Sequence, residues 1–103
     1  MARYDVYANP DKAERALVPF FLDVQNDHIK GIQSRVVVPL WDASVVTTIL
    51  ENINPVLDVN GHRVVMDTPA IGSVPSNALK SVANIANQQL AIQDALDALF
   101  GAY

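Results

Sequence analysis

Short apolar runs separated by turn residues occupy the first three quarters of the chain. Segments 3–7, 20–25 and 35–38 are rich in aromatic or β-branched residues, which predicts three β-strands. The polar segments 9–12 and 26–31 are typical of the turns between them. Pro39 is expected to end the third strand, because proline has no N–H to donate to a β-ladder.

A β-hairpin is the clearest local prediction. Asn60 and Gly61 separate the apolar runs 56–59 and 62–66, and an Asn-Gly pair suits a two-residue turn that needs positive φ at both positions. Segment 71–74 is compatible with a further short strand. Segment 42–50 is compatible with a short helix capped by Asp42 or Ser44, although its β-branched residues favour helix poorly.

The period becomes helical near the C-terminus, which predicts a helix over 84–100. Val82 would extend the apolar face of this helix if it began earlier. We expect that face to pack on the sheet. Its members at 100° per residue are Ile85, Gln89, Ile92, Leu96, Leu99 and Phe100.

The neighbouring helix face combines one large apolar side chain with carboxylates, and Asn87 lies beside it. A solvated face does not need the leucine, so this face is a candidate binding surface; alternatively, the leucine is one of the scattered exposed leucines common in proteins. No basic side chain follows Lys80, so the C-terminal end of the helix is acidic. This acidic end either serves a cationic partner or has no functional consequence. The residues of this face are Leu90, Asp94, Asp97 and Gly101.

Composition limits the possible classes of protein. The 103 residues are expected to form one domain, and a chain that is 50% hydrophobic and 17% charged is not disordered throughout. The absence of cysteine excludes disulfides, a cysteine nucleophile and thiolate zinc sites. The net charge of −4 argues against broad electrostatic binding to nucleic acid. No signal peptide or membrane span is evident, so a cytoplasmic location is expected.

Catalytic motifs are scarce. The chain has neither a glycine-rich phosphate loop nor a Gly-x-Ser-x-Gly elbow, and its two histidines do not indicate a metal site. A metal-free ribonuclease would need a base, an acid and a cation, residue types that most domains contain. The candidates for these roles are His28 or His62, Asp23 or Asp27, and Arg35 or Arg63.

Three motifs, in order and at matching spacing, resemble the CcdB toxin family. They are Phe-Leu-Asp-Val-Gln-Asn-Asp at 21–27, Arg-Val-Val-Val-Pro-Leu at 35–40 and Ser-Val-Pro at 73–75. The chain also ends about one turn past its predicted helix, as the family does. The resemblance covers residues 4–103.

The resemblance implies a mainly β (α+β) fold, a small SH3-like β-barrel with a C-terminal helix that is shared with the MazF and Kid ribonuclease toxins. Family members are homodimeric toxins of type II toxin–antitoxin modules, use no cofactor and are not enzymes. They bind the A subunit of DNA gyrase and trap its complex with cleaved DNA. A cognate antitoxin neutralises them through a disordered C-terminal segment, and the operator DNA is contacted only through the antitoxin.

The resemblance also implies the partner-binding residues. The family ends in Phe-Trp-Gly-Ile, and Phe100 matches the phenylalanine, whereas Gly, Ala and Tyr replace the last three residues. Asp94 and Asp97 stand at asparagine positions, Leu90 stands at a polar one, and positions 28 and 29 match two isoleucines. The expected gyrase-type surface comprises His28, Ile29, Leu90, Asp94, Asp97, Phe100, Gly101, Ala102 and Tyr103.

Loss of the family's tryptophan leaves alternatives open. Truncation of one central aromatic residue at an interface costs about 2–4 kcal/mol. The chain therefore either still poisons gyrase or topoisomerase IV with compensating changes, or binds its antitoxin without poisoning. A ribonuclease of the MazF and Kid kind is the further alternative. We expect the helix flank and tail to face a protein, rather than a groove to face a substrate.

Overall fold

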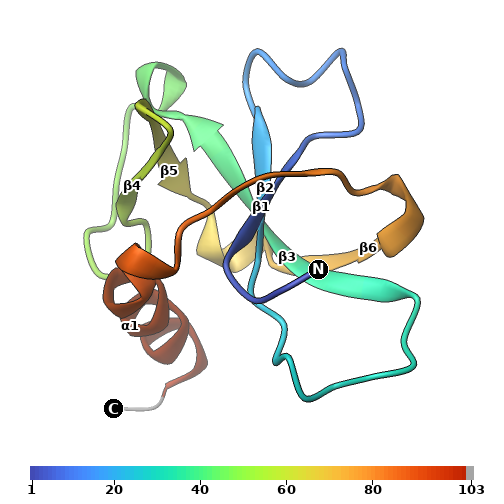
Figure 1. The fold of residues 1–103 in the computed structure, drawn as a ribbon. Helices are drawn as coiled ribbons and strands as arrows, with labels where there is room; N and C mark the ends of the chain where they lie inside the picture. The colour runs from blue at the N-terminus through green and yellow to red at the C-terminus, as the bar shows by residue number, and fades with distance from the viewer. Residues whose placement is uncertain (102–103) are drawn as a thin grey trace.

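The structure is a computed structural model that describes residues 1–101 (Figure 1). Its strands form one curled antiparallel sheet, and its α-helix comes last in the chain. The strands are β1 (Asp5–Ala8), β2 (Phe20–Asp23), β3 (Ser34–Asp42), β4 (Val56–Val59), β5 (His62–Met66), β6 (Gly72–Pro75) and β7 (Ser81–Asn84). The helix is α1 (Gln89–Phe100), and short 3-10 helices lie at Ala43–Val45, Thr68–Ala70, Ser76–Ala78 and Ala86–Gln88.

Strand β3 is the centre of the sheet. The strand order is β4-β5-β3-β2-β1-β7, and β6 pairs with the first half of β3. Helix α1 packs on one face of the curled sheet, so the core lies between helix and strands (Figure 1). The expected mainly β fold, a small barrel-like sheet with a C-terminal helix, is thus confirmed. The core includes Val6, Leu22, Val38, Leu40, Leu57, Val64, Met66, Ile92, Ala95 and Leu96.

The predicted hairpin is confirmed. Strands β4 and β5 pair antiparallel, with Val59 opposite His62. Asn60 has φ of 51° and Gly61 has φ of 89°, the left-handed conformations that a two-residue turn of this kind requires. The expected strand near 71–74 is also present as β6.

The prediction that Pro39 ends the third strand is wrong, because β3 continues to Asp42. Pro39 lies opposite Phe21 of β2. On its other side, β3 changes partner from β6, which ends its pairing at Val37, to β5, which begins at Leu40. The missing N–H therefore removes no ladder bond there, and the Pro39 carbonyl accepts from the backbone N–H of Asp67.

The short helix considered for 42–50 is largely absent. Only Ala43–Val45 forms a single 3-10 turn, and the chain then runs on without helix to Leu50. Asp42 does cap this turn, since its carboxylate accepts from the Ser44 N–H at 2.9 Å. The β-branched residues that follow explain why the turn does not propagate.

The C-terminal helix begins later than the sequence predicts. Residues 81–84 form β7, an unpredicted strand that pairs with β1 and includes Val82. Helix α1 starts at Gln89 and is capped by Gly101, whose φ is 74°. Ile92 and Leu96 are buried as expected, whereas Gln89 and Phe100, which were expected to pack on the sheet, are exposed. Within residues 1–101, no helix has the length and apolar character that membrane crossing requires.

Candidate functional site

Three chain segments far apart in sequence meet around a groove of about 370 Å³. The N-terminal segment contributes Arg3, the loop between β2 and β3 contributes Ile29, and α1 contributes Asp97 and Phe100. Phe100 is 69% exposed and Ile29 is 46% exposed. The groove therefore has an accessible apolar rim with a charge of each sign.

The β2–β3 loop is held in place by short polar contacts. The Asn26 side-chain oxygen accepts from the His28 N–H at 2.8 Å, which is an Asx turn. The Ile29 N–H donates to the Asn26 carbonyl at 3.1 Å. Asp27 accepts from the Arg3 backbone N–H at 2.7 Å, so the loop is tied to the N-terminal segment.

A buried ionic network lies at the end of β2, where this loop starts. The Arg35 guanidinium donates to both oxygens of Asp23, from Nε at 2.6 Å and from Nη2 at 2.9 Å. The Tyr7 hydroxyl donates to the same carboxylate at 2.5 Å. Burial, and then the hydrogen bond to Asp23, raise the pKa of Tyr7 well above its usual range. The hydrogen bond to Asp23 likewise raises the pKa of Arg35.

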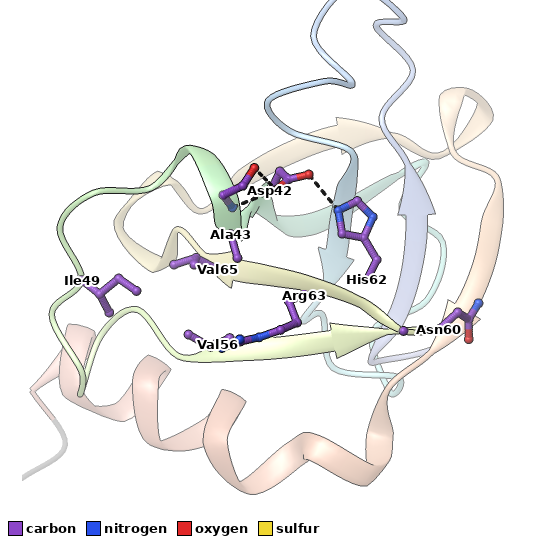
Figure 2. Close-up of a pocket in the computed structure, with 10 residues that line it drawn as sticks. Asp42, Ala43, Ile49, Val56, Asn60, His62, Arg63 and Val65 are labelled. Atoms are coloured by element: carbon purple, nitrogen blue, oxygen red, sulfur yellow. Dashed lines mark hydrogen bonds and ion pairs between the residues drawn. The ribbon is translucent and has the colours of Figure 1, made fainter.

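A second hollow, of about 820 Å³, lies beside the hairpin turn (Figure 2). In it, His62 Nε2 lies 3.0 Å from Asp42 Oδ2, and Arg63 projects from the next position of β5. The Ser44 hydroxyl and backbone N–H, together with His62, lower the pKa of Asp42 to about 2. The hollow thus brings His62 and Asp42 into contact, and Arg63 also lines it.

Comparison with known proteins identifies the family. The chain matches the family described as CcdB protein over residues 3–101, which is nearly its whole length. The chain belongs to the CcdB family. No curated protein matches it. CcdB membership agrees with the curled sheet and the terminal helix described above.

The structure brings together only part of the surface expected for a CcdB protein. Ile29, Asp97 and Phe100 line the groove. Leu90 is 78% exposed on α1, and Asp94 lines a separate groove of about 420 Å³ with Glu51. His28 and Gly101 are exposed and do not line the groove, and residues 102 and 103 lie outside the described part of the chain.

Sequence reasoning missed several residues of the groove. Arg3, Gln25, Asn26 and Gln93 line it, but they come from three segments whose proximity no local pattern indicates. The Asp-Val-Gln motif did draw attention to Gln25. The Gln25 side-chain oxygen accepts from the Val36 N–H at 2.9 Å, so this side chain mainly stabilises the sheet.

The residues considered for a ribonuclease do not form one site in this CcdB protein. Asp23 and Arg35 pair in the interior, where Asp23 is fully buried. His62 and Arg63 line the hollow instead, with Asp42 as their carboxylate. His28 and Asp27 lie in the β2–β3 loop, where Asp27 Oδ1 is 3.7 Å from Arg35 Nη2.

Proposed function

We propose that this chain is the toxin of a type II toxin–antitoxin module and binds the A subunit of DNA gyrase. Membership of the CcdB family implies a toxin of a toxin–antitoxin pair. The observation that carries the finer proposal is the groove, at which Ile29 of the β2–β3 loop meets Asp97 and Phe100 of α1. Ile29 and Phe100, together with Leu90 elsewhere on α1, leave large apolar side chains accessible to a protein partner.

Phe100 is the aromatic anchor in this proposal. It is 69% exposed and borders the groove, so it can enter a pocket on gyrase without any rearrangement of the core. Aromatic residues at the centre of an interface supply about 2–4 kcal/mol, or roughly 30- to 1,000-fold in affinity. Phe100 is the phenylalanine that the family also carries, so it keeps one of the family's two aromatic contacts and does not replace the tryptophan of the following position.

The proposed action is non-enzymatic and takes place in the cytoplasm. The toxin acts as a homodimer that stabilises the covalent complex of gyrase with cleaved DNA. A cognate antitoxin with a disordered C-terminal segment neutralises it, and the pair contacts operator DNA through the antitoxin. Sedimentation at tens of micromolar tests the dimer, since a monomer at that concentration contradicts it.

A plasmid-cleavage assay tests the gyrase proposal. Purified gyrase, ATP and supercoiled plasmid are incubated with the protein, and detergent then releases trapped breaks as linear DNA. We expect linear DNA with the wild type and at least about tenfold less with Phe100→Ala. Leu17→Ala is the matched control, because Leu17 is an exposed leucine in the β1–β2 loop, outside the groove. No linear DNA and no binding to gyrase A at micromolar wild-type protein would refute the proposal.

The closest alternative is that this protein retains the CcdB fold but no longer poisons gyrase. The last three residues depart from the family's Trp-Gly-Ile ending, and that departure favours this reading. It predicts that the protein still binds an antitoxin encoded beside it, whereas overexpression without that antitoxin is harmless. Growth arrest on overexpression would exclude it.

The hollow beside the hairpin supports one function of another class, RNA cleavage. In this reading, Asp42, whose Oδ2 lies 3.0 Å from His62 Nε2, orients His62 as a general base, and Arg63, which also lines the hollow, stabilises phosphate charge. Incubation with single-stranded RNA tests this function. Cleavage that is lost in His62→Ala and retained in His28→Ala would support it, and intact RNA after prolonged incubation would remove it.

A further inference from the structure

The turn of the β4–β5 hairpin combines an exposed Asn-Gly pair with a carboxylate. The Gly61 N–H donates to Asp58 Oδ1 at 2.9 Å, and Asp58, Asn60 and Gly61 are all exposed. No other asparagine in the chain precedes a glycine. Asparagine is a thermolabile residue, because its side-chain carbonyl carbon can be attacked by the backbone nitrogen of the next residue. Here that nitrogen already contacts a base.

The attacking nitrogen and the side chain it would attack are both accessible. None of the hydrogen bonds within residues 1–101 involves the Asn60 side chain, which lies at the tip of the hairpin (Figure 2). Apart from its chain neighbours, no atom lies within 4 Å of the position that a Cβ of Gly61 would occupy. The five-membered ring that the attack forms therefore has room beside Gly61.

We propose that Asn60 is a site of spontaneous deamidation in which Asp58 acts as the general base. Asp58 takes the Gly61 N–H proton as the nitrogen forms a bond to Asn60 Cγ. The Cγ–Nδ2 bond then breaks, and the proton leaves with the departing ammonia. Water, the only co-reactant, opens the resulting succinimide at either carbonyl and leaves aspartate or isoaspartate at position 60.

The hydrogen bond to Asp58 has two opposing effects on this reaction. It restrains the turn, yet it also lies on the proton that the nitrogen must lose, and a positioned base contributes about 10²- to 10⁴-fold to such a step. The base prevails because the turn is exposed and no hydrogen bond holds the Asn60 side chain. The motion that brings the two reacting atoms together is therefore local and leaves the core folded.

The modification changes both the hairpin and the hollow beside it. Either product adds a carboxylate to a turn that already contains Asp58, and isoaspartate lengthens the backbone path by one carbon. A two-residue turn sets the register of its strands, so the longer path disturbs the pairing of Val59 with His62. Asn60 also lines the hollow with Arg63, so the new negative charge offsets the positive charge of Arg63 there.

Peptide mapping by tandem mass spectrometry tests the proposal on the intact folded protein. The wild type and Asp58→Asn are incubated at neutral pH, and the converted fraction at position 60 is followed with time. The variant keeps an oxygen that accepts from the Gly61 N–H but has no basic carboxylate. We expect conversion to be at least about tenfold slower in Asp58→Asn, and faster again in Asp58→Glu, which retains a carboxylate.

Asn77 is the internal control, because it is exposed and precedes the small Ala78. Its conversion should be the same in all three proteins. Hydrogen exchange of the β4 and β5 amides shows whether each variant keeps the hairpin. Conversion of Asn60 that is equal or faster in Asp58→Asn with an intact hairpin overturns the proposal, and so does wild-type conversion of Asn60 no faster than that of Asn77.

The pH dependence of the wild type is a second test that needs no variant. The charged groups nearest the turn in the sheet are Arg63, opposite Asp58 on β5, and His62, which follows Gly61. Between about pH 7.5 and about pH 8.5, above the usual range of carboxyl and histidine titration, a carboxylate base gives a rise in rate well below tenfold. A full rise of about tenfold identifies hydroxide as the base and overturns the proposal. Neither test involves gyrase or an antitoxin, so their failure leaves the proposed function standing.

Discussion

Replacement of Asp23 by asparagine should destabilise the protein more than any other conservative change in its interior. The carboxylate is fully buried and accepts four hydrogen bonds, from Tyr7, from Gln25 and twice from Arg35. The asparagine amide can accept only at its oxygen, so in either orientation two donors face its NH₂ group. The Arg35 guanidinium then loses its counter-charge in the interior.

Removal of one partner from a buried ion pair costs about 3–5 kcal/mol. Stabilities of small domains are about 5–15 kcal/mol, so this variant loses a large fraction of the total. At about 4–8 °C per kcal/mol, the midpoint of thermal unfolding falls by at least about 12 °C. Tyr7→Phe removes one donor and leaves the ion pair intact, so it should cost less, about 1.5–3 kcal/mol.

Urea unfolding measures both variants, with the fluorescence of Trp41 as the signal, because it is the single tryptophan and lies in β3. A double variant, Asp23→Leu with Arg35→Met, should recover part of the loss, since it leaves no unpaired charge in the interior. If Asp23→Asn lies within about 1 kcal/mol of the wild type, the ionised pair contributes far less than the reasoning requires.

Three further predictions concern pH and the sheet edge. Folding raises the pKa of Tyr7 above its ordinary value of 10.0, so the unfolded chain loses this proton first and the free energy of unfolding falls as pH rises above 10. Chemical unfolding at pH 9 to 12 should show a fall of up to about 1.4 kcal/mol per pH unit. The fall should be weaker in Tyr7→Phe. NMR titration should place the pKa of Asp42 at about 2, so its stabilising effect is lost as pH falls from 3.8 towards 2, and Ser44→Ala should raise this pKa. The Gln88 side-chain N–H donates to the Asp58 carbonyl at 2.8 Å, and its side-chain oxygen accepts from the Asp58 N–H at 2.9 Å. Gln88→Ala should therefore lower the free energy of unfolding by about 1–2 kcal/mol and expose the edge of β4. Thermal unfolding would detect the first effect, and light scattering would detect the second.

Local patterns predicted those parts of the fold that local physics decides. The Asn60-Gly61 turn has few conformational alternatives, and the flanking runs then pair in the only register that the turn permits. Strand β7 was missed because its four residues, Ser-Val-Ala-Asn, carry no strand pattern of their own. Its strand conformation comes from pairing with β1, which lies far away in the sequence.

Part of the candidate groove was indicated by the family resemblance and not by local patterns. The family resemblance pointed to Ile29, Asp97 and Phe100, and these residues line one groove. Arg3 and Gln93 were not predictable, since their place in the groove depends on the tertiary contact between the N-terminal segment and α1. The contact between Gln93 and Tyr4, with Tyr4 at a positive φ, is a tertiary outcome that a single sequence does not encode locally.

The exposure of Phe100 follows from a small rotation of the helix relative to the predicted face. At 100° per residue, the buried residues Ile92, Ala95 and Leu96 centre the packed face about 40° away from the centre of the predicted one. The predicted face omits Ala95 because alanine gives a weak hydrophobic signal, yet Ala95 is 1% exposed. This rotation turns Phe100 away from the sheet and towards the side of Asp97. The close packing of the small Ala95 thus goes with a helix orientation that leaves Phe100, the aromatic residue of α1, exposed.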